Sequence, residues 1–197
     1  RFPDATINVL NRGINGEEVG DILQRLQGSV LVEKPDLVIW QLGTNTVLRD
    51  RDIGVHEAPI REGIARIRAS GADLMMIDPQ YAPRVIAKHE KLEEMNALLH
   101  KVARQERVAM FPRYALMEHW HDEGVGFERF VHADGLHHND WSYACIAKLM
   151  AGMMADTLEP LLAGGIVADA SADMMRGKAL ASVRKASQAL GFFAIAP

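Results

Sequence analysis

The sequence predicts an α/β fold in which a parallel sheet is covered by helices. Segments of strand character alternate with segments of helix character from Ala5 to Leu158. Two of the strand-like segments are nearly continuous apolar runs, which is typical of strands buried on both faces. The segments between them repeat apolar residues at helical spacing. Strands that alternate with helices form parallel sheets, because each crossover helix returns the chain to the same edge.

The first part of the chain supplies two strands and one helix in this interpretation. Residues 5–10 are short and rich in β-branched side chains, and they end at the turn residues Asn11 and Gly13. A helix is expected from Glu17 to Leu31, since its apolar residues fall on one face. Asp36–Leu42 is expected to be a strand buried on both faces.

The same alternation continues through the rest of the chain. A helix follows around residues 60–67, and a second buried strand is expected at 73–78, where Pro79 stops it. A helix around residues 92–102 leads to a short strand at 108–111. A long final helix is expected from Asp140 to Leu158.

Composition limits the classes of function. The chain has 197 residues, 48% of them hydrophobic, and a formal net charge of −4, so nothing in its charge favours nucleic acid or an anionic membrane as a partner. Cys145 is its one cysteine, so no internal disulfide can form. No apolar run is long enough for a membrane span. The oligomeric state and the localisation stay open at this stage.

The last part of the chain differs in composition. We expect one domain at residues 1–162 and a C-terminal helical tail or linker at 163–197, which opens with Gly164 and Gly165 and is rich in alanine. Leu180 begins an apolar stripe there that suits a docked helix; a partner-binding or membrane-surface helix is the alternative.

Four residues with catalytic chemistry are expected at one edge of the sheet. Gly13 and Asn45 each follow a predicted strand, and Asp134 and His137 precede the last predicted helix. In open α/β sheets, active groups gather beyond the carboxyl ends of the strands. The coarse fold therefore predicts that the three segments carrying these residues lie together.

Asp134 and His137 have the spacing of an acid and a base on one loop. A carboxylate there can accept a hydrogen bond from one imidazole nitrogen, which fixes the tautomer and leaves the other nitrogen as a base. The alternative is an ordinary Asp-Gly turn with His137 on the surface. Asn45 can donate its amide to an oxyanion, and Gly13 can offer its backbone N–H, although both residue types are also common in turns.

These segments resemble the conserved blocks of the SGNH hydrolases, also called the GDSL lipase/esterase family. Residues 11–16 (N-R-G-I-N-G) resemble the second block, 43–46 (G-T-N-T) the third, and 134–137 (D-G-L-H) the fifth. The resemblance implies a three-layer α/β/α, flavodoxin-like fold and a serine ester hydrolase with no cofactor and no metal. Asp134 and His137 would be the triad acid and base, with Gly13 and Asn45 as oxyanion donors. Thr46 stands where the third block usually has aspartate.

The first block of that family, G-D-S with the serine nucleophile, has no counterpart in this chain. We expect the strand that carries it to lie before Arg1, so that this chain alone does not hydrolyse esters. A non-catalytic binding module of the same fold is the alternative. The resemblance slightly favours a periplasmic or secreted protein, and it leaves open whether the ester substrate is a lipid, a carbohydrate or a small molecule.

A metal site is a competing interpretation of the histidine-rich loop. The residues that would form it are His132, Asp134, His137, His138 and Asp140, with help from His119 and His121. Their side chains suit zinc, but no metal-binding spacing such as H-E-x-x-H supports the site.

Overall fold

A computed structural model describes residues 6–162 of the chain. The chain divides into two compact units, Arg1–Tyr114 and Ala115–Pro197, and each is described by itself. The predicted tail at 163–197 lies outside the described residues, so the predicted division at residue 162 stays a prediction.

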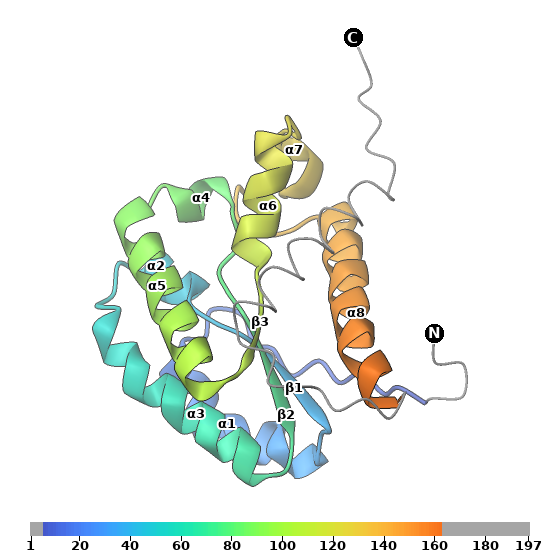
Figure 1. The fold of residues 1–197 in the computed structure, drawn as a ribbon. Helices are drawn as coiled ribbons and strands as arrows, with labels where there is room; N and C mark the ends of the chain where they lie inside the picture. Colours follow the sequence, from blue (N-terminus) through green and yellow to red (C-terminus); the bar gives the residue numbers. More distant parts are fainter. Residues whose placement is uncertain (1–5, 163–197) are drawn as a thin grey trace. The chain divides into compact units, whose positions relative to one another are not determined.

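The first unit is built on a parallel sheet in the order β1-β2-β3. The strands are β1 (Leu37–Gln41), β2 (Asp73–Ile77) and β3 (Ala109–Phe111). Residues Leu37 to Gln41 pair in register with Asp73 to Ile77, and Met75 to Ile77 pair with Ala109 to Phe111. The predicted α/β class with a parallel sheet is confirmed (Figure 1).

The helices of this unit, of which the periodicity predicts the three longest, precede or connect the strands. They are α1 (Val19–Ser29), α2 (Thr44–Leu48), α3 (Glu57–Ala69), α4 (Pro83–Ile86) and α5 (His89–Glu106), with 3-10 turns η1 (Leu31–Glu33) and η2 (Gly54–His56). The expected apolar face of α3, formed by Ile60, Ile64 and Ile67, is at most 1% exposed. Burial of such a stripe is the main source of stability for a helix of this length.

Trp40 joins β1 to the helices. Its side chain is 5% exposed, and its ring lies so close to Gly63 of α3 that a Cβ added there would be 2.2 Å from Trp40 Cη2. Leu23 of α1 lies 3.1 Å from the same point. The absence of a side chain at Gly63 therefore lets α3 approach the strand closely enough to bury the Trp40 ring.

Two strand predictions in the first unit are wrong. Residues 6–10 form no strand: they are irregular, and Ile7 and Val9 are 74% and 86% exposed. Strand β1 is buried on one face only, with Leu37 and Ile39 38% and 44% exposed. A β-branched segment becomes a strand only when a neighbouring strand pairs with it, and an apolar run is buried on both faces only when both faces are covered.

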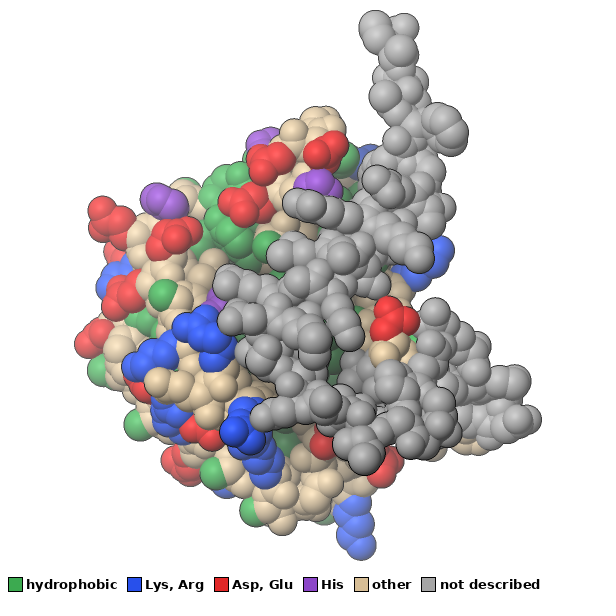
Figure 2. Space-filling model, viewed as in Figure 1, with side chains coloured by type: hydrophobic (Ala, Val, Ile, Leu, Met, Phe, Trp, Pro, Cys, Tyr) green, Lys and Arg blue, Asp and Glu red, His purple; other side chains and the backbone are tan. Residues whose placement is uncertain are grey.

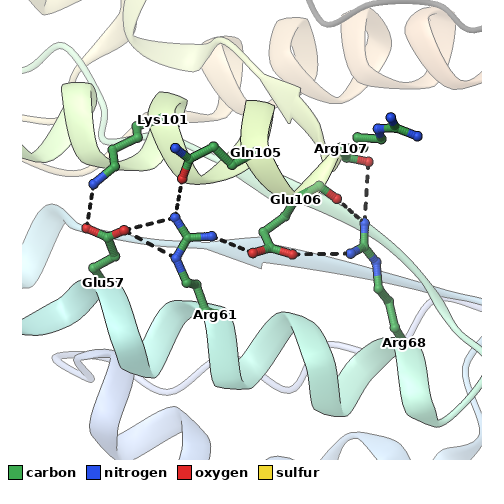
Figure 3. A network of polar contacts seen from close by, with 7 residues as sticks. All are labelled: Glu57, Arg61, Arg68, Lys101, Gln105, Glu106 and Arg107. Carbon is green, nitrogen blue, oxygen red and sulfur yellow. Dashed lines mark hydrogen bonds and ion pairs between the residues drawn. The ribbon is translucent and has the colours of Figure 1, made fainter.

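Helices α3 and α5 are also joined by a network of charges (Figure 3). Arg61 donates to Glu57 at 2.9 Å within α3 and also binds Glu106 and Gln105 of α5. Lys101 donates to Glu57 at 2.8 Å. Elsewhere on the visible described surface, acidic and basic side chains are interspersed (Figure 2).

Helix α6 (Arg113–Asp122) begins at the end of the first unit, and all but its first two residues belong to the second. The second unit also holds α7 (Phe127–Phe130) and α8 (Asp140–Leu162). The expected final helix is therefore confirmed. Trp120 packs edge-on against Phe130 at 5.7 Å and against Trp141 at 5.2 Å between ring centroids. These aromatic contacts join the three helices and fix the loop that connects α7 to α8. Across the described part of the chain, no helix has both the length and the apolar character needed to cross a membrane.

Candidate active site

The loop between α7 and α8 carries the predicted acid and base. It is closed by an antiparallel bridge between Val131 and His138, and His132 N donates to His137 O at 2.7 Å. Inside the loop, Gly135 has φ 69°, in the left-handed region that favours glycine. The Asp-Gly pair of the sequence therefore makes the turn that brings residues 134 and 137 face to face.

Asp134 and His137 are in direct contact. His137 Nδ1 lies 2.5 Å from Asp134 Oδ2, and Asp134 Oδ1 accepts the backbone N–H groups of Leu136 and His137, each at 2.9 Å. One carboxylate thus orients both the imidazole ring and the backbone that carries it. The side chain of His137 is 61% exposed, so its ring is accessible from solvent.

The same contacts change the acidity of the carboxyl group. The hydrogen bond from the His137 ring, followed by the backbone N–H groups of His137 and Leu136, holds the pKa of Asp134 far below its ordinary value of 3.8. The group is therefore a carboxylate throughout the neutral pH range. The carboxylate can accept a hydrogen bond from the Nδ1–H group of His137, and it can stabilise an imidazolium without taking up the proton itself.

Asn139 ends this loop and begins α8. Its Oδ1 accepts the backbone N–H of Ser142 at 3.0 Å, and its Nδ2 donates to Arg129 O at 2.9 Å. This is helix N-capping by a preferred residue type. Ser142 itself is fully buried on α8; its Oγ donates to Asn139 O and lies 3.3 Å from His138 Nδ1. Because Ser142 is closed off from solvent, it is a packing residue and not a nucleophile.

Asn45 lies in the first turn of α2, a short helix that the sequence pattern did not predict. The helix begins directly after β1 through Gly43, whose φ of 92° favours glycine. Asn45 is half-buried, and its Nδ2 donates to Glu17 O at 2.8 Å. A side-chain amide carries two N–H groups, so this bond fixes the orientation of Asn45 and leaves it a second donor.

Gly13 lies in the exposed, irregular segment before α1, not after a strand as predicted. Its N–H donates to Asn11 Oδ1 at 2.9 Å, forming an Asx turn. Three residues later, Gly16 has φ 80°. The segment therefore contains an Asx turn at Gly13 and a second turn at Gly16.

A buried polar group at the end of β2 was not found by sequence reasoning. Asp78 is 1% exposed, and its Oδ1 accepts the backbone N–H of Tyr114 at 2.9 Å. Arg113, 4% exposed, donates to Asp78 O at 2.6 and 3.0 Å and to Gln41 Oε1 at 2.8 Å. These bonds tie together the carboxyl ends of two strands and the start of α6. Neither residue belongs to a recognisable motif, so only the three-dimensional fold identifies them.

Gly13 and Asn45 belong to the first unit, and Asp134 and His137 belong to the second. The geometry of each pair therefore stands by itself, and the meeting of all four at one edge stays a prediction. The alternative of a metal site gains no support: among residues 6–162, no three His, Cys, Asp or Glu side chains are grouped so that they could hold an ion.

Comparison with known proteins places the chain in a family. Residues 1–160 match the model of the non-GDSL lipase-like family. Esterase TesA of Pseudomonas aeruginosa is 31% identical over 163 residues, which cover 78% of this chain and 71% of the relative. An arylesterase of Vibrio mimicus is 26% identical over 145 residues, covering 74% and 68% of the two chains.

Solved structures agree on the fold. An acetylxylan esterase of Geobacillus stearothermophilus superposes with a TM-score of 0.65 over 75% of this chain and 72% of that one, at 19% identity. A crystal structure of TesA superposes with a TM-score of 0.59 at 27% identity, covering 78% and 79% of the two chains. The fold, the family model and the similarity to named esterases agree: this chain belongs to the non-GDSL lipase-like family of SGNH-type ester hydrolases.

Proposed function

We propose that this chain contributes the acid, the base and the oxyanion donors of a serine esterase that cleaves carboxylic esters. The observation that carries the proposal is the 2.5 Å contact between His137 Nδ1 and Asp134 Oδ2 on an accessible loop. Occupation of Nδ1 by the carboxylate leaves Nε2 to exchange a proton with the reacting groups. The function classes named for the relatives, esterase and arylesterase, agree with this chemistry.

The reaction then follows two balanced steps. A serine oxygen attacks the acyl carbon while His137 takes the serine proton, and the tetrahedral intermediate expels the alcohol, which leaves with that proton. Water next attacks the acyl-serine and loses a proton to His137, and the second tetrahedral intermediate releases the carboxylic acid while His137 returns that proton to the serine oxygen. Asp134 stays ionised throughout and stabilises the imidazolium in both steps.

Asn45 and Gly13 are the proposed donors to the oxyanion. The bond from Asn45 to Glu17 O supports the first assignment, because a fixed amide loses little freedom when it donates its other N–H to substrate. Gly13 can serve once its N–H exchanges Asn11 Oδ1 for the substrate oxygen. Each such donor contributes roughly 3–4 kcal/mol to transition-state stabilisation in comparable sites.

The serine is the finer part of the proposal. We place it in a segment before Arg1, on a strand that pairs with β1, which is an edge strand of the described sheet. The exposed apolar side chains of Leu37 and Ile39, and of Ile7 and Val9 in the neighbouring part of the sequence, support an apolar partner there. Among the described serines, Ser142 is closed off by burial, and Ser29 and Ser70 stand at the ends of α1 and α3.

The acetylxylan esterase offers a parallel for these roles. Three of its solved variants are described as catalytic mutants, and they replace a serine, an aspartate and a histidine. In that protein the aspartate precedes the histidine by three positions, which is the spacing of Asp134 and His137 here. This parallel supports the Asp-His assignment and the expectation of a separate serine.

The test uses the protein together with any residues that its gene encodes before Arg1. In that protein, His137→Ala should lower kcat for p-nitrophenyl acetate by about 10²–10⁴-fold, as expected for loss of general acid–base catalysis. His132→Ala is the matched control, because it removes an exposed imidazole from the same loop and should keep kcat within about twofold.

Labelling with a fluorophosphonate identifies the nucleophile in the same protein. Labelling at a serine before Arg1 supports the full triad. A folded His137→Ala variant with near-full activity would contradict the assignment of the base. An extended protein that folds but neither labels nor turns over esters would favour the non-catalytic binding module instead.

A further inference from the structure

Residues 11–17, which contain Gly13 and Gly16 and lie just before α1, form the glycine-rich segment. Helix α2 binds this segment through two side chains that are one helical turn apart. Asn45 donates to Glu17 O at 2.8 Å, and Arg49, which caps the end of the helix, donates to Gly16 O at 2.7 Å. Side chains four positions apart share one face of a helix, so both contacts come from the same side of α2.

Arg49 makes a second bond that continues into α1. Its Nη1 donates to Glu18 Oε1 at 2.6 Å, and the side chain of Glu18 is only 15% exposed. Glu18 is also the N-cap of α1, where its backbone N–H donates to Asp21 Oδ2 at 3.0 Å. The guanidinium thus holds the carbonyl of Gly16 and the carboxylate of Glu18 at once, a task that suits its planar fork of donors.

An arginine and a histidine also lie near the same carboxylate, but they contact it differently. Arg51 Nε is 3.8 Å and His56 Nε2 is 3.9 Å from Glu18, which are distances of ion pairs and not of hydrogen bonds. Arg51 is also 63% exposed, so water screens its interaction strongly. Arg49 is therefore the residue of this group whose hydrogen bonds connect the glycine-rich segment to α2.

This connection joins the two elements that carry the proposed oxyanion donors. Gly13 lies just before Gly16 in a segment whose residues 11–16 are all exposed, and exposed turns of this kind are easily displaced unless side chains hold them. Asn45 lies on the helix that Arg49 caps. A shift of the segment relative to α2 would change the separation of the two donors.

We infer that Arg49 is a positioning residue, which sets the distance between the Gly13 N–H and the Asn45 amide by clamping Gly16 O and Glu18. The inference rests on the proposed function, because Gly13 and Asn45 are the oxyanion donors proposed there. It assigns a role to a residue outside the four proposed site residues. Donors to an oxyanion act mainly in the transition state, so the loss of Arg49 should lower kcat and leave KM nearly unchanged.

Kinetics of Arg49→Gln and Arg51→Gln in the N-terminally extended protein test this inference. Both variants remove one positive charge near Glu18, but only the first removes the hydrogen bonds to Gly16 O and Glu18 Oε1. We expect kcat to fall by about 10- to 100-fold in Arg49→Gln with KM within about twofold, and both constants to stay near wild type in Arg51→Gln. Arg49→Lys keeps the charge without the fork and should lie between them.

Two further measurements separate positioning from a loss of folding. Inhibition by phenylboronic acid, which forms a tetrahedral adduct with an active serine, should weaken in parallel with kcat in Arg49→Gln. Amide hydrogen exchange over residues 11–18 should be faster in Arg49→Gln than in Arg51→Gln, and this readout needs no activity. If Arg49→Gln does not fold, Arg49→Lys carries the same comparisons.

The outcomes distinguish the two proposals. If His137→Ala is inactive while Arg49→Gln and Arg49→Lys match Arg51→Gln in kcat and in exchange, the clamp is refuted and the esterase proposal stands. A fall in activity that only mirrors the folded fraction, with unchanged boronate affinity, also overturns the positioning role. If the wild type has no esterase activity, the proposed function fails, and with it the catalytic task of Arg49, whatever the exchange rates show.

Discussion

At the scale of single residues, Asp134 depends mainly on His137 for its low pKa. The His137 ring is the largest cause of that shift, ahead of the two backbone N–H groups. A carboxyl group whose folded pKa is lowered contributes stability above its ordinary pKa, and the contribution is lost as the pH falls through the folded value. Protonation of Asp134 therefore cannot explain any loss of activity between pH 5 and 8.

A titration tests this dependence directly. In His137→Ala, the pKa of Asp134 should rise toward its ordinary value of 3.8, and it should not reach that value, because the backbone N–H groups of Leu136 and residue 137 still donate. Carbon-13 NMR of the Asp134 carboxyl group follows the change. His132→Ala is the control and should leave the midpoint in place. An unchanged midpoint in His137→Ala would rule out the ring as the main cause.

Gly43 offers a second test at this scale, because it turns the chain from β1 into the helix of Asn45. Its φ is 92°, and an added Cβ would lie 2.6 Å from Met95 Cγ. Gly71 has a similar φ of 87° but nothing within 4 Å of such a Cβ. Both Gly→Ala variants carry the backbone strain, about 1–3 kcal/mol, and only Gly43→Ala adds a steric clash.

Thermal melting should therefore rank Gly43→Ala below Gly71→Ala, which in turn lies below the wild type. Equal melting temperatures for the two variants would mean that Met95 moves aside without cost. In that case the turn at Gly43 is not held by packing against α5.

At the scale of elements, the α3–α5 charge network gives a pH-dependent contribution to stability. Hydrogen bonds from Lys101 and then Arg61 hold the pKa of Glu57 below its ordinary value of 4.5. Its contribution is thus fully present above pH 4.5 and lost as the pH falls through the lower folded value. Glu57→Gln should lower the melting temperature at pH 7, and the difference from wild type should shrink below about pH 4.5.

Glu62→Gln is the control for this network. Glu62 is on the same helix, but its side chain is 60% exposed and its ion pair with Arg66 is long, at 3.5 Å. Its replacement should therefore have little effect at either pH. A Glu57→Gln difference that stays constant down to pH 3 would show that the charge of Glu57 is not the source.

The sequence predicted the elements whose signal is local. Period and length alone locate α3, α5, β2 and α8, because a buried stripe or a buried run is a property of consecutive residues. The strand at 5–10 and the double burial of β1 were wrong, since both depend on neighbours that local pattern does not describe. Helix α2 was missed because five residues are too few for a periodic signal.

The same distinction holds within the candidate site. Asp134 and His137 could be predicted as a pair because the contact spans one turn. The bonds from Asn45 to Glu17 and from Arg49 to Gly16 join residues 28 and 33 positions apart, and the Arg113–Asp78 bonds join residues 35 apart. Such contacts appear only when the sheet and its helices are assembled.

At the scale of the whole molecule, the exposed apolar side of β1 predicts a property of the extended protein. If a strand before Arg1 pairs with β1, its side chains lie beside Leu37 and Ile39, so the exposure of these two residues should fall when the segment is present. Dye binding to exposed apolar surface should fall, and the melting temperature should rise, relative to residues 1–197 alone. Ile39→Thr in the 197-residue chain is the control: it should also reduce dye binding, but it should not raise activity.

Extended protein that binds dye as strongly as the 197-residue chain would show that another surface of the molecule receives the segment. The serine would then be placed elsewhere, and the proposed pairing with β1 would have to be abandoned.

The small size of the Asp134–His137 loop has a consequence for how the proposed catalytic pair assembles. The bridge from Val131 to His138 closes a ring of eight residues, and the bonds that orient the pair lie inside it. Loops of about ten residues close in roughly 10–100 ns, long before parallel strands with large sequence separation can pair. We therefore expect Asp134 and His137 to reach their relative geometry earlier in folding than the distant strands of the sheet can pair. The contacts that set this geometry are therefore local, whereas the place of the loop depends on the helices on either side, which hold it through Trp120 and Asn139.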